Sequence, residues 1–413
     1  TYVNQESYRL DHIAFVELGK KKLSYAEYDS IREFYKNDFQ KFIEYNIVDV
    51  ELVHQLEEKL KLMELALALA FSAKVNFEDV FSQVRTWDAI IYHYLREQNI
   101  VIPPKEGSKK TDQYAGAYVK DPITGMHDWV VSFDLNSLYP HLIMQYNISP
   151  ETITDDGIWR YLSVDSILEK STASMKYVEK HKSNGLCVAA SGNTFRRDIK
   201  GFLPTLMEKM YAERKMYKKK MIECQKKKEE LVRGSPPAGM SRAGLNKKLT
   251  NDIAKFHNFQ QVRKIQLNSA YGAIGNQYFR YYSTEMAESI TLSGQLSIRW
   301  IMNALNDFLN KTLETDNYDY IVASDTDSVY LRLGNLVDRV LPQCDDKDKI
   351  TNFLDKSSRD IILPFIEKKY DELSVMMNAY ENKMVMDREV IADKGIWTAK
   401  KRYMLNVIDS EGI

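Results

Sequence analysis

The chain has 413 residues, of which 44% are apolar and 28% charged, and its formal net charge is −1. These proportions are typical of a soluble globular protein, and no apolar run approaches the roughly 20 residues that cross a bilayer, so we expect no membrane role. The length predicts two or three domains. The three cysteines lie far apart, which argues against a disulfide framework or a zinc site. We expect a fragment, because the chain begins at Thr1 without a methionine or a signal-peptide pattern.

The first hundred residues have the apolar spacing of helices. Apolar side chains recur at helical intervals over residues 39–69, which predicts one or two packed helices. Thr86 is a candidate N-cap for a further helix, which Pro103 and Pro104 would end. Residues 105–110 are polar and contain glycine, so we expect a linker there.

Two segments with the sequence pattern of strands lie next to aspartates. Residues 129–133 predict a strand that runs directly into Asp134. Apolar and β-branched residues flank Asp325 and Asp327, which predicts a β-hairpin with the acidic pair at its turn. The period of two along a strand would place both carboxylates on one face of the sheet, where their repulsion calls for a cation.

The acidic pair alone does not decide the chemistry, because Asp-x-Asp in a turn is more often a solvated turn than a metal site. Asp134 would supply a third oxygen ligand from another strand. A few carboxylates with room for phosphates suit Mg²⁺ or Mn²⁺ better than zinc. Two such ions about 4 Å apart would stabilise the attacking and leaving oxygens of an in-line phosphoryl transfer.

Two long helical patterns follow, at about residues 205–232 and 245–271, and a segment rich in glycine and proline separates them. This arrangement predicts an antiparallel helical hairpin. Between residues 208 and 264, basic side chains outnumber acidic ones by roughly ten. A solvated helix face is the simpler interpretation of such a run, and a phosphate-binding surface is the alternative.

Five side chains of the hairpin fall on shared helix faces. Arg214 and Lys218 have i, i+4 spacing, and Lys264, Asn268 and Tyr271 follow at i, i+4 and i+7. Arginine binds phosphate bidentately and lysine acts as a point charge, so the two helices could clamp a triphosphate. Taken singly, each of these residues is more simply an exposed surface residue.

Residues 134–140 (DLNSLYP), 264–272 (KIQLNSAYG) and 325–328 (DTDS) resemble, in this order, motifs A, B and C of family B DNA polymerases. Three ordered motifs are a specific signal. Further segments are similar to the replicative polymerases of T4-like bacteriophages; they are residues 86–91, 275–276, 279–282 and 397–403. The resemblance covers nearly the whole chain, although the hairpin helices are shorter than in those enzymes and residues 152–200 match poorly.

The resemblance implies an α/β (α+β) fold: a family B palm with an antiparallel sheet, inserted antiparallel helical fingers and a partial exonuclease domain. It implies five segments: the C-terminal region of a 3′–5′ exonuclease domain at 1–62, a helical linker or N-terminal-domain segment at 63–105, a first palm segment at 106–200, fingers at 201–276 and a second palm segment at 277–413. The family's thumb and the first two exonuclease motifs would lie outside this chain, so we expect no proofreading by it alone.

The resemblance also assigns roles in nucleotide transfer. Asp134 and Asp327 would bridge two Mg²⁺ ions, with Mn²⁺ as a substitute, the Leu135 carbonyl as an added ligand and Asp325 alongside. Tyr139 would be a steric gate that leaves no room for a 2′-hydroxyl. The full set of residues implied to bind the nucleotide is Ser137, Leu138, Tyr139, Arg214, Lys218, Lys264 and Asn268.

Other implied roles concern DNA. Tyr271 and Gly272 would pack at the nascent base pair, and Tyr114 and Gly116 would lie in a template-contacting loop. The basic stretch Lys400, Lys401, Arg402 and Tyr403 would track the primer strand. Glu389 matches a carboxylate near the metals, although a structural salt bridge explains it equally well. Tyr45 and Asp49 resemble the third motif of the proofreading exonuclease.

The implied function is template-directed addition of dNTPs to a primer 3′-hydroxyl in phage DNA replication. Primer-template DNA and dNTPs would be its partners, with a sliding clamp and a single-strand-binding protein acting through regions outside this chain. The location would be the cytoplasm of an infected bacterium. Two alternatives stay open: a reverse transcriptase or RNA polymerase, which Tyr139 disfavours, and a non-catalytic DNA-binding subunit of a split or truncated polymerase.

Overall fold

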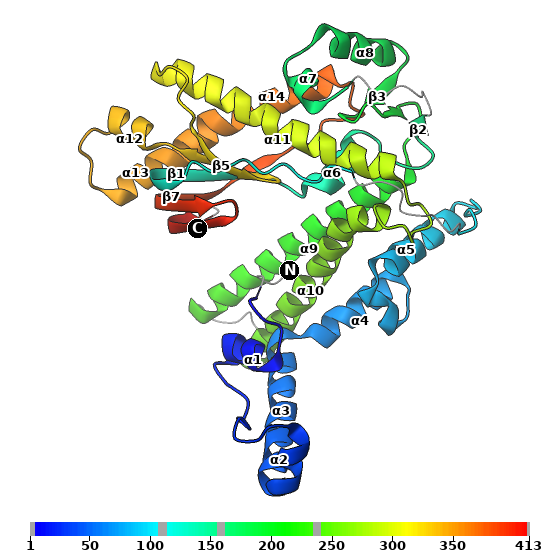
Figure 1. Cartoon of the computed structure of the whole chain (residues 1–413), viewed down its shortest axis with the longest axis vertical. Helices are drawn as coiled ribbons and strands as arrows, with labels where there is room; N and C mark the ends of the chain where they lie inside the picture. The colour runs from blue at the N-terminus through cyan, green and yellow to red at the C-terminus, as the bar shows by residue number, and fades with distance from the viewer. Residues whose placement is uncertain (1–4, 106–113, 155–161, 234–240, 411–413) are drawn as a thin grey trace. The chain divides into compact units, whose positions relative to one another are not determined.

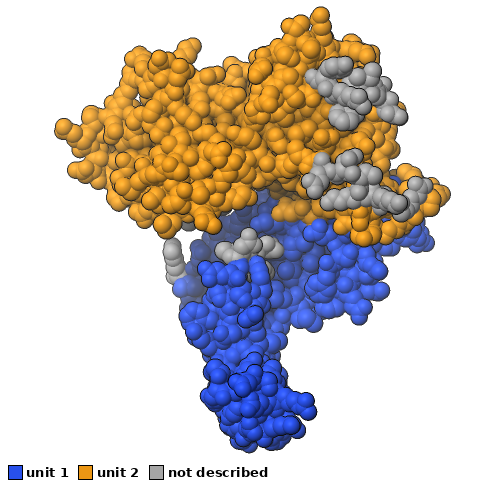
Figure 2. Space-filling model, viewed as in Figure 1, with its two compact units in different colours: residues 1–97, 214–265 blue, residues 98–213, 266–413 orange. Residues whose placement is uncertain are grey.

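The computed structural model describes residues 5–105, 114–154, 162–233 and 241–410. The chain forms two compact units, one of residues 1–97 and 214–265 and the other of residues 98–213 and 266–413 (Figure 2). Most of the expected linker at 105–110 and the glycine- and proline-rich tip of the helical hairpin lie outside the described residues. None of the described helices is both long and apolar enough to cross a membrane.

Unit 2 is built on an antiparallel sheet with the strand order β5-β6-β1-β7-β8 (Figure 1). Strands distant in sequence are therefore neighbours: β1 lies between β6 and β7. The strands are β1 (Gly125–Leu135), β5 (Ile321–Asp325), β6 (Ser328–Arg332), β7 (Met386–Ala399) and β8 (Arg402–Ser410). The predicted strand at 129–133 and the predicted hairpin around residue 326 are both confirmed.

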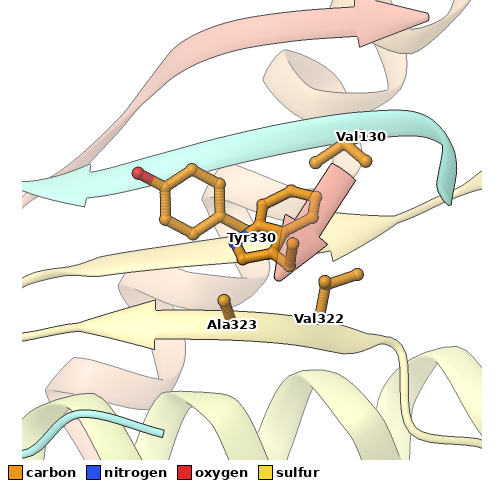
Figure 3. Close-up of a cluster of buried hydrophobic side chains, with 5 residues drawn as sticks. Val130, Val322, Ala323 and Tyr330 are labelled. Carbon is orange, nitrogen blue, oxygen red and sulfur yellow. The ribbon is translucent and has the colours of Figure 1, made fainter. Parts of the chain in front are cut away.

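Apolar side chains from the central strands hold the sheet together. Val130, Val322, Ala323 and Tyr330 form one buried cluster with Trp397 (Figure 3). Val130 and Val322 are almost fully buried, and each such side chain stabilises the fold by about 1.5–3 kcal/mol relative to an exposed one. The strands that contribute to this cluster also contain predicted site residues. Packing in the cluster therefore helps to hold in place the end of the sheet at which the carboxylates lie.

Helices pack against strands of this sheet within unit 2; they are α11 (Thr284–Leu313), α12 (Gly334–Val340), α13 (Lys347–Ser357) and α14 (Leu363–Met376). The long helix α11, which Ser283 caps, packs against β5, β6 and α6 (Leu138–Gln145) (Figure 1). A second sheet has the order β2-β4-β3. The remaining elements are β2 (Ile153–Thr154), α7 (Val164–Leu168), α8 (Thr172–Ser183), β3 (Leu186–Val188), β4 (Thr194–Arg196) and η2 (Ser358–Ile362).

Unit 1 is helical in its described residues. Its first elements are α1 (Leu10–Leu18), α2 (Ile31–Asn37), α3 (Phe39–Leu60), α4 (Leu62–Ala73), η1 (Phe77–Phe81) and α5 (Gln83–Glu97). Lys61, at φ 54°, separates α3 from α4, so the expected one or two helices are two. The expected N-cap at Thr86 is wrong. Helix α5 begins at Gln83, where the Ser82 hydroxyl accepts from the Arg85 N–H.

The helical hairpin is confirmed as α9 (Phe202–Arg233) and α10 (Arg242–Ile274). Within unit 1 the two helices pack through aromatic rings, with Tyr217 and Phe259 centroids 5.2 Å apart. Near the tip, Arg242 Nη2 donates to the Leu231 carbonyl at 2.6 Å. Each helix contributes to both units, because residues 214–265 belong to unit 1 and the other ends belong to unit 2.

Candidate active site

Strand pairing in unit 2 brings the predicted carboxylates together. Asp134, the penultimate residue of β1, is paired with Ser328 of β6 on one side and with Asp387 of β7 on the other. The Leu135 N–H donates to the carbonyl of Asp327 at 2.9 Å. The backbone therefore places Asp134 and Asp327 at the same end of adjacent strands.

The acidic turn has a geometry that differs from the expected alternation along a strand. Asp325 ends β5, Thr326 adopts the left-handed conformation at φ 61°, and Asp327 precedes β6. The Asp327 N–H donates to the Asp325 carbonyl at 2.7 Å, and the Thr326 N–H donates to the Tyr118 carbonyl at 3.0 Å. The period of two does not apply here, because the chain reverses between the two aspartates.

Burial and mutual repulsion make two of these carboxylates hard to ionise. Burial, with Asp327, Glu389 and Asp387 adding repulsion, raises the pKa of Asp134 to about 8. Burial also raises the pKa of Asp327 to about 6, against a backbone hydrogen bond that lowers it and with further repulsion from Asp325 and Glu389. Buried carboxylates of this kind favour a bound cation, because it offsets both desolvation and repulsion.

These residues fit a hard divalent cation in charge and donor type. Asp134 and Asp327 offer carboxylate oxygens, and Mg²⁺ is commonly held by one or two carboxylates together with substrate phosphates. Across the described residues, no three or more His, Cys, Asp or Glu side chains are grouped closely enough to hold an ion by themselves. Asp325 instead forms an ion pair with a lysine: Lys401 Nζ lies 3.4 Å from its carboxylate.

Sequence reasoning missed two contributors. Asp387 faces Asp134 across β1 and β7, and its carboxylate accepts from Asn136 Nδ2 at 2.5 Å. Its only sequence signal was its place two residues before Glu389. Tyr118, whose carbonyl holds the acidic turn, gave no signal, because a backbone contact does not depend on residue type. Glu389 forms no ion pair within the described part of the chain, and it contributes to both raised pKa values.

An aromatic group lies beside these carboxylates in unit 2. Tyr139, on the first turn of α6, has its ring centroid 4.6 Å from that of Tyr271 on α10. The Tyr271 hydroxyl donates to the Tyr114 hydroxyl oxygen at 3.4 Å. Burial, with a contribution from Asp327 and Tyr114, raises the pKa of Tyr139. Ser137, at φ 50°, and buried Leu138 form the turn that leads from β1 into α6.

Of the residues predicted to contact DNA in unit 2, Tyr271 and Gly272 lie on α10, and the others occupy two further segments. In the first, Gln295 Nε2 donates to the Gly116 carbonyl at 2.6 Å. In the second, between β7 and β8, Lys400 Nζ lies 3.0 Å from the Asp121 carboxylate and Arg402 is exposed. The ring of Tyr403 stacks on Trp397 with centroids 5.4 Å apart, so the second segment is fixed to the buried core of the sheet.

The predicted triphosphate ligands are divided between the units. Arg214, Lys218 and Lys264 belong to unit 1, where Lys218 is exposed and the other two are half-buried. Asn268, which was predicted to support them, is exposed and belongs to unit 2. Gly272, predicted to pack at the nascent base pair, is also exposed and belongs to unit 2.

The residues that resemble an exonuclease motif lie on α3 of unit 1. Lys22 Nζ lies 2.7 Å from the Asp49 carboxylate and 4.7 Å from the centroid of the Tyr45 ring. One lysine therefore connects Tyr45 and Asp49. An ion pair with half-buried partners of this kind contributes about 1 kcal/mol or less to stability.

The chain is similar in sequence to known DNA polymerases. The profile of DNA polymerase family B matches residues 77–235 and 240–352. The chain is 34% identical to the DNA-directed DNA polymerase of Escherichia phage RB69 over 100% of this chain and 48% of the relative. It is 33% identical to the DNA-directed DNA polymerase of Enterobacteria phage T4 over 99% of this chain and 48% of the relative. It is 24% identical to DNA polymerase 1 of Pyrococcus abyssi over 99% of this chain and 43% of that protein.

The chain thus spans about half the length of the curated relatives it matches. The match includes both strand regions that carry the carboxylates and both helices of the hairpin. The chain belongs to DNA polymerase family B.

Proposed function

We propose that the chain catalyses template-directed addition of deoxynucleotides to a primer 3′-hydroxyl. The observation that carries this proposal is the half-buried pair Asp134 and Asp327, which backbone pairing holds at one end of adjacent strands. Family membership supports it, since the matched relatives from phages RB69 and T4 are DNA-directed DNA polymerases. Strongly perturbed carboxylates at a strand end are typical of functional sites.

Asp134, Asp327 and the Leu135 carbonyl would hold two Mg²⁺ ions, or Mn²⁺ in their place, with Asp325 alongside. Bound there, the ions would neutralise charge on the attacking and leaving oxygens of phosphoryl transfer. The protein's own role is then positioning, because phosphoryl transfer needs little covalent chemistry from side chains.

Residues around the carboxylates would hold the nucleotide. Tyr139 lies against Tyr271, and we propose that its ring lies under the sugar and excludes a 2′-hydroxyl. Arg214, Lys218 and Lys264 would bind the triphosphate, and Asn268 would support them. Ser137 and Leu138 would contribute the backbone of the turn beneath the nucleotide.

DNA would be held without regard to its sequence. Lys400, Lys401, Arg402 and Tyr403 would contact the primer strand, while Tyr114 and Gly116 would contact the template. Tyr271 and Gly272 would pack at the new base pair. Contacts to the backbone position a duplex without reading it, as a copying enzyme requires. Glu389 would support the metal site, and Tyr45 with Asp49 would belong to an exonuclease site.

The five segments assigned from the resemblance belong to this proposal: 1–62, 63–105, 106–200, 201–276 and 277–413. A sliding clamp and a single-strand-binding protein would act through other regions, in the cytoplasm of an infected bacterium. A second candidate is a non-catalytic or incomplete DNA-binding subunit of a split or truncated polymerase, and it is considered because the chain spans about half the length of its matched relatives.

Primer extension tests the proposal. With Mg²⁺, dNTPs and primer-template DNA, we expect extension that EDTA abolishes and that Asp327→Ala reduces by at least about 1,000-fold. Asp316→Asn, which changes an exposed aspartate outside the sheet, is the matched control and should extend normally. Extension that survives Asp327→Ala would contradict the mechanism. DNA binding without extension by the unchanged chain would favour the second candidate.

A further inference from the structure

Gly275 follows the last residue of α10, and its N–H donates to the carbonyl of Tyr271 at 3.1 Å. It does not adopt a positive φ, so its backbone conformation is open to any L-residue. A Cβ at this position would instead fall on the hydroxyl oxygen of Tyr114. Its next nearest neighbours, Tyr114 Cζ at 3.6 Å and the Tyr271 carbonyl at 3.7 Å, would be at ordinary contact distance. The hydroxyl of Tyr114 is thus the one severe obstacle among the described residues.

The Tyr114 hydroxyl connects Gly275 to the candidate active site. It accepts from the Tyr271 hydroxyl, and the Tyr271 ring in turn contacts Tyr139 with centroids 4.6 Å apart. All four residues belong to unit 2. A displaced Tyr114 would leave the hydroxyl of Tyr271 without this partner, so the ring beside Tyr139 would lose one of its constraints.

We infer that Gly275 is a positioning residue: the lack of a side chain there lets Tyr114 bind Tyr271 and so sets the ring against which Tyr139 packs. This inference rests on the proposed function, because it assigns Gly275 an influence on nucleotide selection. Gly275 acts through Tyr114 and touches no substrate in this account. Through Tyr114 and Tyr271, Gly275 would affect how well the incoming sugar and the new base pair fit into the site.

Glycine is required at position 275 because a larger residue would collide with the Tyr114 hydroxyl, and not because the backbone needs the freedom of glycine. Removing only the Tyr114 hydroxyl, by Tyr114→Phe, removes the atom that a Cβ would meet. Alanine at 275 should therefore be harmful beside tyrosine and harmless beside phenylalanine. At Gly244, near the start of α10, an added Cβ would come no nearer than 3.8 Å to any of the described neighbours, so Gly244→Ala is a matched control.

The first experiment needs no catalysis. A single 3-fluorotyrosine is placed at position 114 by site-specific incorporation, and its ¹⁹F resonance is compared in the otherwise unchanged chain, in Gly275→Ala and in Gly244→Ala. We expect a shifted resonance in Gly275→Ala alone, because the ring must move away from the new methyl group. An unchanged resonance in Gly275→Ala would overturn the inference, even if the chain extends no primer.

The second experiment measures nucleotide selection. Steady-state kcat/KM for a correct dNTP and for the matching rNTP is determined for Gly275→Ala, both in the otherwise unchanged chain and combined with Tyr114→Phe. We expect Gly275→Ala to lower kcat/KM for the dNTP roughly 10-fold to 100-fold beside Tyr114, and to lower discrimination against the rNTP. In chains that already carry Tyr114→Phe, the same change should alter either quantity by less than about 2-fold. Equal losses in both backgrounds would show that Gly275 does not act through the Tyr114 hydroxyl.

Discussion

The acidic end of the sheet and the basic faces of α9 and α10 have opposite charges, and the backbone positions their charged side chains in different ways. Asp134 and Asp327 are held by backbone pairing between β1 and β6, in a largely buried setting. Lys218 and Lys264 extend from long helices, and their positions follow from helical spacing and not from strand pairing. Rigid pairing suits the chemistry, which tolerates little displacement, whereas a long side chain on a helix can adjust to a substrate. Substitutions in the two regions should therefore fail in different ways.

In the basic region, the largest effect is expected at Lys264. Lys264→Ala should lower kcat/KM for dNTPs about 100-fold to 1,000-fold, because the charge proposed to bind the triphosphate is lost. Single-nucleotide incorporation at varied dNTP concentration measures this loss, and DNA affinity should change little. Lys247→Ala, an exposed lysine on the same helix, is the control. Equal losses in both variants would show that the basic face acts only through its overall charge.

An intermediate effect is expected at Tyr139, which lies next to the acidic region. Tyr139→Ala should lower discrimination between dNTP and rNTP about 10-fold to 100-fold, since removing the ring opens space for a 2′-hydroxyl. Tyr139→Phe keeps the ring and should keep the discrimination. The ratio of kcat/KM values for the two sugars decides the matter. A loss that is as large with phenylalanine as with alanine would show that the hydroxyl, and not the ring, selects the sugar.

The two regions also differ in how far the sequence could predict them. The hairpin helices and the strands that carry Asp134, Asp325 and Asp327 were predicted, because their apolar patterns are strong and local. Thr86 was placed wrongly as an N-cap, since Ser82 is an equally suitable residue four positions earlier. The hairpin turn at Thr326 was predicted, but its left-handed conformation and the hydrogen bond from its N–H to the Tyr118 carbonyl were not.

Local sequence patterns could not predict which residues far apart in the sequence are neighbours in the site. Asp387 faces Asp134 although 253 positions separate them (387 − 134), and only the pairing of β1 with β7 reveals that they are neighbours. The contact between Tyr114 and Gly275 is of the same kind. Spacing along the chain reports the faces of single helices and strands, and carries no information about which elements meet.

The smallest effect is expected on stability. Asp134→Asn should stabilise the metal-free fold, although the proposed mechanism needs this carboxylate for activity. Burial and repulsion raise the pKa of Asp134 from its ordinary 3.8 to about 8 in the folded chain, so its ionised form destabilises the fold. Without metal, stability should therefore fall as pH rises from about 4 toward 8. In EDTA at pH 8, Asp134→Asn should raise the melting temperature by a few degrees, equivalent to about 1 kcal/mol.

The benefit of Asp134→Asn should disappear near pH 4, where the carboxyl group is protonated in both the folded and the unfolded chain. Thermal melts of both proteins across this pH range measure it. Lys264→Ala, in the basic region, should show no such pH dependence. An Asp134→Asn variant that is less stable than the unchanged chain at pH 8 would show that the ionised Asp134 carboxylate does not destabilise the fold.

Mn²⁺ binding, followed by electron paramagnetic resonance in the presence of a non-hydrolysable dNTP, tests most directly whether Asp134 and Asp327 hold metal ions. We expect Asp327→Asn to lose at least one of the bound ions, while Asp316→Asn binds Mn²⁺ as the unchanged chain does. Identical binding curves for the unchanged chain and Asp327→Asn would contradict the assignment of the carboxylates as the metal site.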